Sequence, residues 1–121
     1  MRGVNQVTLL GNLGIDPDLR HTKSGIPVCN LRLCTNTQHV DANNQTRNVA
    51  EWHNVTVWGT QGTQTANQLI QGCTVMVQGR LESHRYINKE GQEVRSWNVV
   101  ANDVIFLTTK DDFEFDDELD D

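Results

Sequence analysis

The stretch EWHNVTVW at residues 51–58, followed by GTQGTQTANQLIQ at residues 59–71, contains the change of pattern that decides the fold. Residues 51–58 alternate in polarity and are rich in β-branched and aromatic side chains, which predicts a β-strand. Residues 59–71 have a helical composition, and Gly72 follows where a C-terminal cap is expected. The apolar residues of this helix fall on one stripe: Ala66, Leu69 and Ile70. A strand that leads directly into one short helix is therefore the centre of the predicted fold.

Strand patterns flank this unit on both sides. Two precede it, at residues 4–13 and 28–37, and two follow it, at residues 74–86 and 94–107. The sequence Asn88-Lys89-Glu90-Gly91 between the last two is a hairpin turn signal. Three strands, one short helix and two strands match the order of an OB-fold, a five-stranded all-β barrel with the helix between its third and fourth strands. A generic five-stranded α+β domain has the same order.

Turn signals and polar segments separate these elements. Asp16-Pro17 and Ser24-Gly25 predict turns between the first two strands. Residues 38–48 are rich in Asn, Gln and Thr, which suits an exposed loop or a loose hairpin. Residues 108–121 form a low-complexity acidic segment that cannot bury enough apolar surface to order itself alone. We therefore expect an OB-fold domain at residues 1–107 and a disordered acidic tail at residues 108–121.

Two tryptophans occupy the polar side of the strand at residues 51–58. Because side chains alternate across a strand, Val55 and Val57 share one face with His53, which predicts a core histidine rather than a ligand or base. The opposite face carries Trp52, Asn54, Thr56 and Trp58. Exposed indole rings would form a stacking platform for bases of any sequence. The alternative, in which one ring seals a barrel end or a subunit contact, fits the pattern equally well.

A second aromatic group flanks the predicted hairpin. Tyr86 shares strand parity with Arg80 and His84, so these three side chains are predicted to line one groove; an ordinary solvent-exposed hairpin is the alternative. Trp97 is predicted to belong to the core instead. Its parity is shared by apolar residues, namely Val99, Ala101, Ile105 and Leu107.

The formal net charge of −6 is unevenly distributed. Residues 108–121 hold eight acidic residues and one lysine, so they carry −7 and leave the remaining 107 residues at +1. The basic residues of that body form no dense run, which argues against a strong grip on duplex phosphates. Stacking is then expected to supply much of any nucleic-acid affinity, with a shallow salt dependence. The basic residues assigned to the binding surface are Arg2, Arg32, Arg80, Arg85 and Lys89.

Catalytic and metal-binding patterns are missing from the sequence. The four histidines show neither H-x-x-x-H nor H-E-x-x-H spacing, and there is no P-loop or G-x-S-x-G motif. The three cysteines are odd in number and lack C-x-x-C spacing, which argues against a disulfide framework and a cysteine zinc site. We expect no enzymatic activity, no cofactor and no metal. The sequence shows no leader pattern and no apolar run of membrane-spanning length, so we expect a cytoplasmic protein.

Several short motifs together resemble a known family, that of bacterial-type single-stranded DNA-binding proteins (SSB), over residues 2–107. They are RGVN at 2–5, LGNLG at 10–14, Asp16-Pro17, Arg20, Glu51-Trp52-His53, Trp58-Gly59 and Gly79-Arg80-Leu81. The resemblance implies an OB-fold that assembles as a homotetramer, around which single-stranded DNA wraps. It also implies that the protein coats and protects this DNA during replication, recombination and repair.

The resemblance assigns roles to individual residues. Trp52 and Tyr86 fall where the family places base-stacking aromatics, and Trp58 falls at a further aromatic contact. His39 occupies a fourth stacking position, where an imidazole stacks over less area. His53 matches a histidine associated with subunit assembly, which competes with the core interpretation, although both bury it. The opening strand would pair between subunits, and the residues assigned to that interface besides His53 are Val4, Gln6 and Thr8.

The acidic tail departs from the family pattern. Family members carry a linker rich in Gly, Pro and Gln and then acidic residues ending in Pro-Phe, which dock into partner proteins; here acidic residues follow the last predicted strand directly. Three roles are open for this tail: docking to a replication or repair protein, competition with DNA for the protein's own groove, and solubilisation. The residues assigned to partner contacts are Phe113, Phe115, Asp116, Asp117 and Leu119.

A second function also fits the sequence. In primosome-type relatives an OB-like domain acts mainly through protein contacts, which predicts weak DNA binding and loss of a partner when residues 113–121 are removed. A DNA-coating protein, by contrast, would be associated with the nucleoid. Base stacking does not distinguish RNA from DNA well.

Overall fold

Long antiparallel strands make up most of residues 1–113, the part of the chain that the computed structural model describes. No helix in this part is long and apolar enough to cross a membrane. The elements, in chain order, are β1 (Val7–Leu13), β2 (Asp18–His21), β3 (Pro27–Val40), β4 (Thr46–Trp58), α1 (Thr60–Gln68), β5 (Thr74–Ile87) and β6 (Glu93–Phe106).

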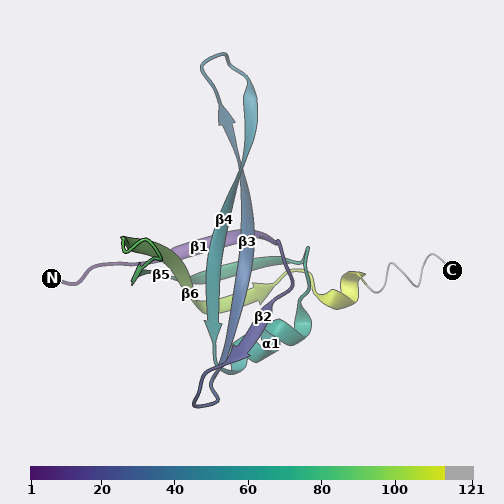
Figure 1. Ribbon diagram of the computed structural model, residues 1–121. Helices are drawn as coiled ribbons and strands as arrows, with labels where there is room; N and C mark the ends of the chain where they lie inside the picture. The colour runs from purple at the N-terminus through teal and green to yellow at the C-terminus, as the bar shows by residue number, and fades with distance from the viewer. Residues whose placement is uncertain (114–121) are drawn as a thin grey trace.

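Five of these strands close into a barrel (Figure 1). β1 pairs with β5, β5 with β6, β6 with β4 and β4 with β3, and β3 returns to β1 where Leu13 lies opposite Leu33. The β4–β6 pairing, in which Val55 lies opposite Val99, is parallel, and the other pairings are antiparallel. α1 lies between β4 and β5 in the chain, which are the third and fourth barrel strands because β2 stands outside the ring. The predicted all-β OB-fold is confirmed.

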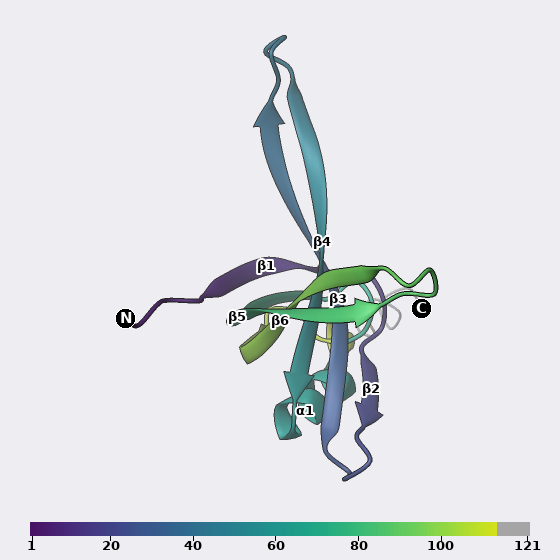
Figure 2. The same ribbon diagram turned by 60° about the vertical axis from the view of Figure 1, so that its left-hand side comes forward.

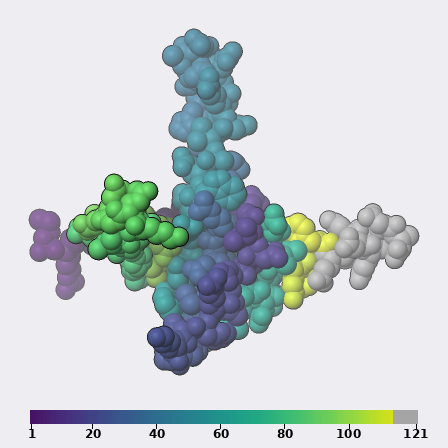
Figure 3. Space-filling view, viewed as in Figure 1, coloured from purple at the N-terminus to yellow at the C-terminus, as the bar shows by residue number. Residues whose placement is uncertain are grey.

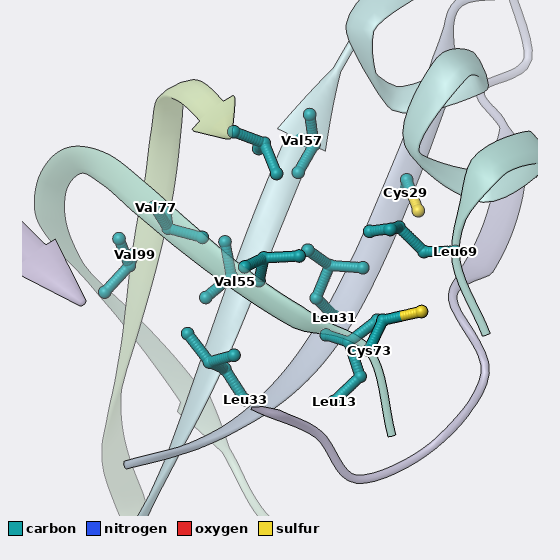
Figure 4. Packing of buried hydrophobic residues seen from close by; sticks show 12 residues of the cluster. Leu13, Cys29, Leu31, Leu33, Val55, Val57, Leu69, Cys73, Val77 and Val99 are labelled. Atoms are coloured by element: carbon teal, nitrogen blue, oxygen red, sulfur yellow. The ribbon is translucent and has the colours of Figure 1, made fainter. Parts of the chain in front are cut away.

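The core lies inside the barrel and is built from alternate residues of its strands (Figure 4). Because the side chains of a strand alternate between its two faces, each barrel strand contributes every second residue to the interior. Fully burying one such aliphatic side chain stabilises the fold by roughly 1.5–3 kcal/mol. The aliphatic residues at the centre are Leu31 and Leu33 of β3, Val55 and Val57 of β4, and Val75 and Val77 of β5.

Two glycines allow the barrel strands to approach closely. A Cβ on Gly11 of β1 would lie within 3.0 Å of the Cys34 carbonyl oxygen of β3. A Cβ on Gly79 of β5 would lie equally close to the Val100 carbonyl oxygen of β6. Since both neighbouring atoms belong to backbone, neither can move aside without displacing a strand. A larger residue at either position would therefore force the neighbouring strand to shift.

The predicted boundaries differ from the observed ones at the start of the chain and after the helix. β2 pairs with residues 27–30 of β3, although only turns were predicted there; the two turn signals leave too short a segment for a recognisable alternation. The helix ends at Gln68 with Leu69 as its cap. Gly72, predicted to be the cap, lies further along in the following turn with a φ of 96°.

The polar segment at residues 38–48 forms the end of a long hairpin rather than a loop. β3 continues to Val40 and β4 begins at Thr46, and this hairpin projects beyond the barrel (Figures 1 and 2). In the turn, the Asp41 carboxylate accepts hydrogen bonds from the backbone N–H groups of Asn43 and Gln45. Because both faces of the projecting hairpin meet solvent, its strands lack the apolar alternation that marks a half-buried strand.

A β-bulge in β6 reverses the alternation of its side chains. Gln78 of β5 lies opposite Asp103, whereas Gly79 lies opposite Ala101, so Asn102 is the extra residue. Val99 and Val104 both point into the core as a result. The predicted inward parity of Ile105 and Leu107 is wrong for this reason, and both are exposed.

Candidate nucleic-acid-binding surface

Strand register brings many of the predicted site residues onto one outer face of β3, β4, β6 and β5. Arg32 of β3 lies opposite Asn54 of β4, and the Asn98 side chain of β6 donates a hydrogen bond to the Thr56 hydroxyl of β4 at 2.6 Å. Asn98 in turn lies opposite Glu82 of β5. By alternation, the residues on this outer face include Arg32, Trp52, Trp58, Arg80, His84 and Tyr86.

Trp52 and Trp58 lie outside the barrel core. Each side chain is 49% exposed in the protomer. They lie six positions apart along β4, which corresponds to about 20 Å. Thr56 between them is buried, and its hydroxyl donates a hydrogen bond to the Asn30 side chain at 3.3 Å. The two rings therefore stand on a fixed strand, and neither is enclosed by the protomer.

The Trp52 ring is held by contacts on two sides. The Arg32 guanidinium lies 5.5 Å from the ring centroid, and its Nη1 donates a hydrogen bond to the Asn54 side-chain oxygen at 2.8 Å. At the edge of the ring lies Gly14, where an added Cβ would come within 3.0 Å of the Trp52 Cζ3 atom. Arg32 and Gly14 thus restrict the orientation of this indole.

Three basic residues of the β5–β6 hairpin, Arg80, His84 and Arg85, lie beside acidic ones. Glu82 lies between Arg80, at 3.2 Å, and His84, at 3.1 Å. Arg85 points to the other side of β5 and lies 3.6 Å from Glu93. These exposed pairs contribute little to stability, but Glu82 and Glu93 offset the positive charge of Arg80 and Arg85.

The remaining predicted contacts lie at the periphery of this surface. Tyr86 is 52% exposed near the end of the β5–β6 hairpin, and Lys89 is exposed in its turn. Arg2 is exposed before β1. His39 lies on the projecting β3–β4 hairpin opposite Arg47, on the alternate side of β3 from Arg32. The structure does not bring His39 together with the tryptophans.

Trp97 is not a core residue. It keeps the inward parity of Val99, but it lies beyond the barrel rim, where β6 and β5 leave the barrel as a hairpin, and it is 53% exposed. The Arg95 guanidinium lies 5.7 Å from its ring centroid. One feature of the sequence indicates this exposure: the neighbours of Trp97 are polar, namely Arg95, Ser96 and Asn98.

A hollow of about 140 Å³ lies where β4 and β6 separate. It is lined by residues from both strands and one from β5. These residues are Trp52, His53, Asn54, Leu81, Trp97, Asn98 and Val99.

The residues predicted to contact another subunit lie in β1, in the segment just before it and on β4. Residues 7–11 of β1 pair with β5 along one edge, and their other edge pairs with no strand among residues 1–113. Val4 is 86% exposed, and Gln6 and Thr8 are exposed too. His53 is half-buried and forms a 2.9 Å hydrogen bond with the Thr35 hydroxyl, which is compatible with both the core and the assembly interpretation.

The first residues of the acidic segment lie against the start of β5. The Thr74 backbone N–H donates a hydrogen bond to the Thr108 hydroxyl at 2.8 Å, and the Thr109 N–H donates one to the Asp112 carboxylate at 2.7 Å. The Phe113 ring lies beside Gly72. The other predicted tail contacts, Phe115, Asp116, Asp117 and Leu119, fall outside the described residues.

The cysteines of the described chain are free thiols, and Cys29 and Cys73 are buried. Burial, with a smaller contribution from the negative charge of Asp18, raises the pKa of the Cys29 thiol to about 11. This thiol is therefore protonated at neutral pH. Residues 1–113 contain no group of three His, Cys, Asp or Glu side chains arranged to hold a metal ion.

Comparison with known proteins identifies relatives over nearly all of the barrel. The single-strand binding protein family model matches residues 4–107. A "Single-stranded DNA-binding protein" of Xanthomonas axonopodis pv. citri is 35% identical over 88% of this chain and 59% of its own length. One of Neisseria meningitidis is 35% identical over 86% of this chain and 60% of its own. The chain thus spans about three fifths of the length of these curated relatives.

Solved structures show the same fold. A Plasmodium falciparum SSB, solved in complex with ssDNA, superposes with a TM-score of 0.82 at 26% identity, covering 88% of this chain and 97% of that one. A deletion mutant of the single-stranded DNA-binding protein from Thermus aquaticus gives a TM-score of 0.78 at 33% identity, covering 88% of this chain and 51% of that one. With the family match over residues 4–107, these findings show that the chain belongs to the single-strand binding protein family.

Proposed function

We propose that this protein binds single-stranded DNA without sequence preference and performs no chemistry on it. The observation that carries the proposal is the presentation of Trp52 and Trp58, each half-exposed, on the outer face of one rigid strand. The names of its relatives and the ssDNA complex of its Plasmodium falciparum neighbour support the same ligand. Coating of single-stranded DNA in replication, recombination and repair is the cellular role that fits, within the cytoplasm and at the nucleoid.

Stacking explains the expected lack of sequence preference. Every base has a π-face, so an indole accepts any base and contributes roughly 1–3 kcal/mol per stacked base. Arg32, beside Trp52, supplies a positive charge for a backbone phosphate at the same place. A strand that passes Trp58 and then Trp52 along β4 reaches Tyr86 on the β5–β6 hairpin by following the outer face.

The direct test is to measure the affinity of Trp52→Ala and Trp58→Ala for oligo-dT. Each variant is expected to bind more weakly by roughly 1–3 kcal/mol, with similar losses on oligo-dC and little binding of duplex by any form. Val40→Ala is a matched control, because it removes an exposed apolar side chain at the tip of the projecting hairpin. Unchanged affinity in both tryptophan variants would contradict the proposal. Weak oligo-dT binding by the native chain itself would favour the protein-interaction alternative.

We also propose that the protein assembles as a homotetramer through β1 and the barrel rim. The unpaired edge of residues 7–11 supports this, because such an edge is a template for pairing with another chain. The contacts would come from Val4, Gln6, Thr8 and His53. Sedimentation velocity of Val4→Glu should show smaller species than the native protein. Val40→Glu, the same substitution at another exposed valine, should not. Native protein that sediments as a monomer would refute the assembly.

For the acidic tail we propose docking to a replication or repair protein, through Phe113, Phe115, Asp116, Asp117 and Leu119. Competition with DNA and simple solubilisation are the other two roles. Removal of residues 114–121 separates them while keeping the hydrogen bonds of Thr108 and Thr109. Loss of a partner with unchanged DNA affinity supports docking, tighter DNA binding supports competition, and lowered solubility alone supports the third role.

A further inference from the structure

The hollow between β4 and β6 is a feature that none of the assigned contacts explains. The two strands pair only at Val55–Val99 and Thr56–Val100. Beyond this point they separate, because β4 continues into one projecting hairpin and β6 belongs to the other. Figure 3 shows the two hairpins as separate projections from the barrel. The hollow lies at their junction, so a strand that crosses from one hairpin to the other passes over it.

Two indole rings line this hollow from different strands. Trp52 comes from β4 and Trp97 from β6, and each is about half-exposed. Each ring also has a guanidinium beside it, Arg32 at 5.5 Å from Trp52 and Arg95 at 5.7 Å from Trp97. Aromatic surface with a nearby cation is the combination that binds single-stranded nucleic acid.

Polar groups of two asparagines complete the lining. The Asn54 side-chain oxygen already accepts a hydrogen bond from Arg32, and the Asn98 side-chain nitrogen already donates one to Thr56. Each of these bonds fixes one end of its amide, which leaves the Asn54 N–H group and the Asn98 oxygen to serve a ligand. One donor and one acceptor suit the edge of a nucleobase, which carries both kinds of group.

We propose that the hollow is a binding subsite for one unpaired base of single-stranded DNA, with Trp97 as a stacking residue. This inference rests on the proposed function and extends it. It places a contact where β4 and β6 separate, with Trp97 from the inner-parity side of β6 and Asn54 and Asn98 from the outer face. The base enters between the two hairpins, stacks on Trp97 and directs its polar edge toward Asn54 and Asn98, while Arg95 faces the backbone.

Photocrosslinking tests the proposal directly. Oligo-dT with 5-iododeoxyuridine at each position in turn is bound to the full chain and irradiated, and the adducts are located by mass spectrometry. We expect adducts on Trp97 as well as on Trp52, and Val40→Ala, the control at the tip of the projecting β3–β4 hairpin, should retain both adducts. Adducts on Trp52, Trp58 or Tyr86 without any on Trp97 would overturn the subsite alone. Absence of binding and of all adducts would overturn the proposed function.

Affinity and assembly provide the second measurement. Trp97→Ala should weaken oligo-dT binding about 5- to 100-fold, and Trp97→Phe should retain more affinity because a phenyl ring still stacks. The sedimentation coefficient without DNA should match that of the native protein in both variants. Altered assembly with unchanged affinity for DNA would show that a second copy of the chain, rather than a base, covers the hollow.

Discussion

The Arg32 guanidinium lies 5.5 Å from the centre of the Trp52 ring, across the β3–β4 pair. Its position is fixed by the hydrogen bond it donates to Asn54, the residue directly opposite it in the register. The contact couples the cation to the orientation of the indole, so that an aromatic face and a positive charge lie at one place on β4.

Replacing Arg32 should therefore weaken binding and change its salt dependence together. Arg32→Ala loses the cation beside the ring, for which we expect a loss of about 0.5–1 kcal/mol and a salt slope about 0.7 less steep. Arg32→Lys keeps the charge but not the planar fork that reaches Asn54, so it should keep the slope and lose part of the affinity. Oligo-dT titrations at several salt concentrations separate the two effects; equal slopes in native protein and Arg32→Ala would contradict this role.

Gly14 controls the Trp52 ring from the other side. Gly14→Ala introduces a Cβ within 3.0 Å of the ring, which must then move, and we expect DNA affinity to fall about 5-fold or more. Gly11→Ala is the matched comparison, because its Cβ meets the Cys34 backbone carbonyl instead.

The two glycine variants should thus fail in different ways. Gly11→Ala should lower the free energy of unfolding by about 1–3 kcal/mol, since it overpacks the barrel closure. Gly14→Ala should lose affinity with a smaller loss of stability. Thermal unfolding and DNA titration of both proteins check this, and a Gly14→Ala protein with native affinity would show that the ring does not depend on this contact.

Glu82 is expected to restrain DNA binding. It pairs with both Arg80 and His84 on the outer face. Glu82→Gln removes the negative charge and keeps the shape, so oligo-dT should bind about 2- to 5-fold more tightly, with a steeper salt slope. Glu93→Gln, next to Arg85 on the other side of the hairpin, is the control. Equal effects of the two variants would argue against a path along the outer face.

The buried Cys29 thiol should make stability fall at high pH. Its pKa is raised to about 11 in the folded protein from an ordinary value of 9.0, so between these values the folded state holds a proton that the unfolded state has lost. Below pH 9, the Cys29 thiol should therefore cause no change of the free energy of unfolding with pH. It should decline between pH 9 and 11 by roughly 2–3 kcal/mol. Cys29→Ala should remove this decline relative to the native protein in denaturant titrations; parallel pH profiles would contradict it.

Strong local signals in the sequence predicted the strands around the core well. The strand at residues 74–86 was observed as Thr74–Ile87, because alternation and a clear turn at Asn88–Gly91 define it. β2 was missed because its four residues depend on pairing with β3, which a local pattern does not contain. For residues 38–48 the sequence left a loop and a loose hairpin open, and the structure shows a hairpin; the pattern did not decide between them because neither face of this hairpin packs on a core.

The candidate site was predictable where alternation alone decides it. Trp52 and Trp58 follow the parity that the sequence predicted, and they lie on the outer face. Trp97 was predicted to lie in the core, but it is exposed. It does share a face of β6 with the core residue Val99, but alternation does not show where along the strand the barrel ends. The bulge at Asn102 is equally invisible in the sequence, and it reverses the faces of the residues that follow.

The proposed function requires that a strand of DNA stacks on the indoles of β4. The most direct measurement is a titration of Trp58→Phe/Trp97→Phe protein with oligo-dT, in which Trp52 is the only fluorescent indole. We expect strong quenching that saturates with binding and is not produced by duplex DNA. Binding of oligo-dT with no change in Trp52 fluorescence would contradict it.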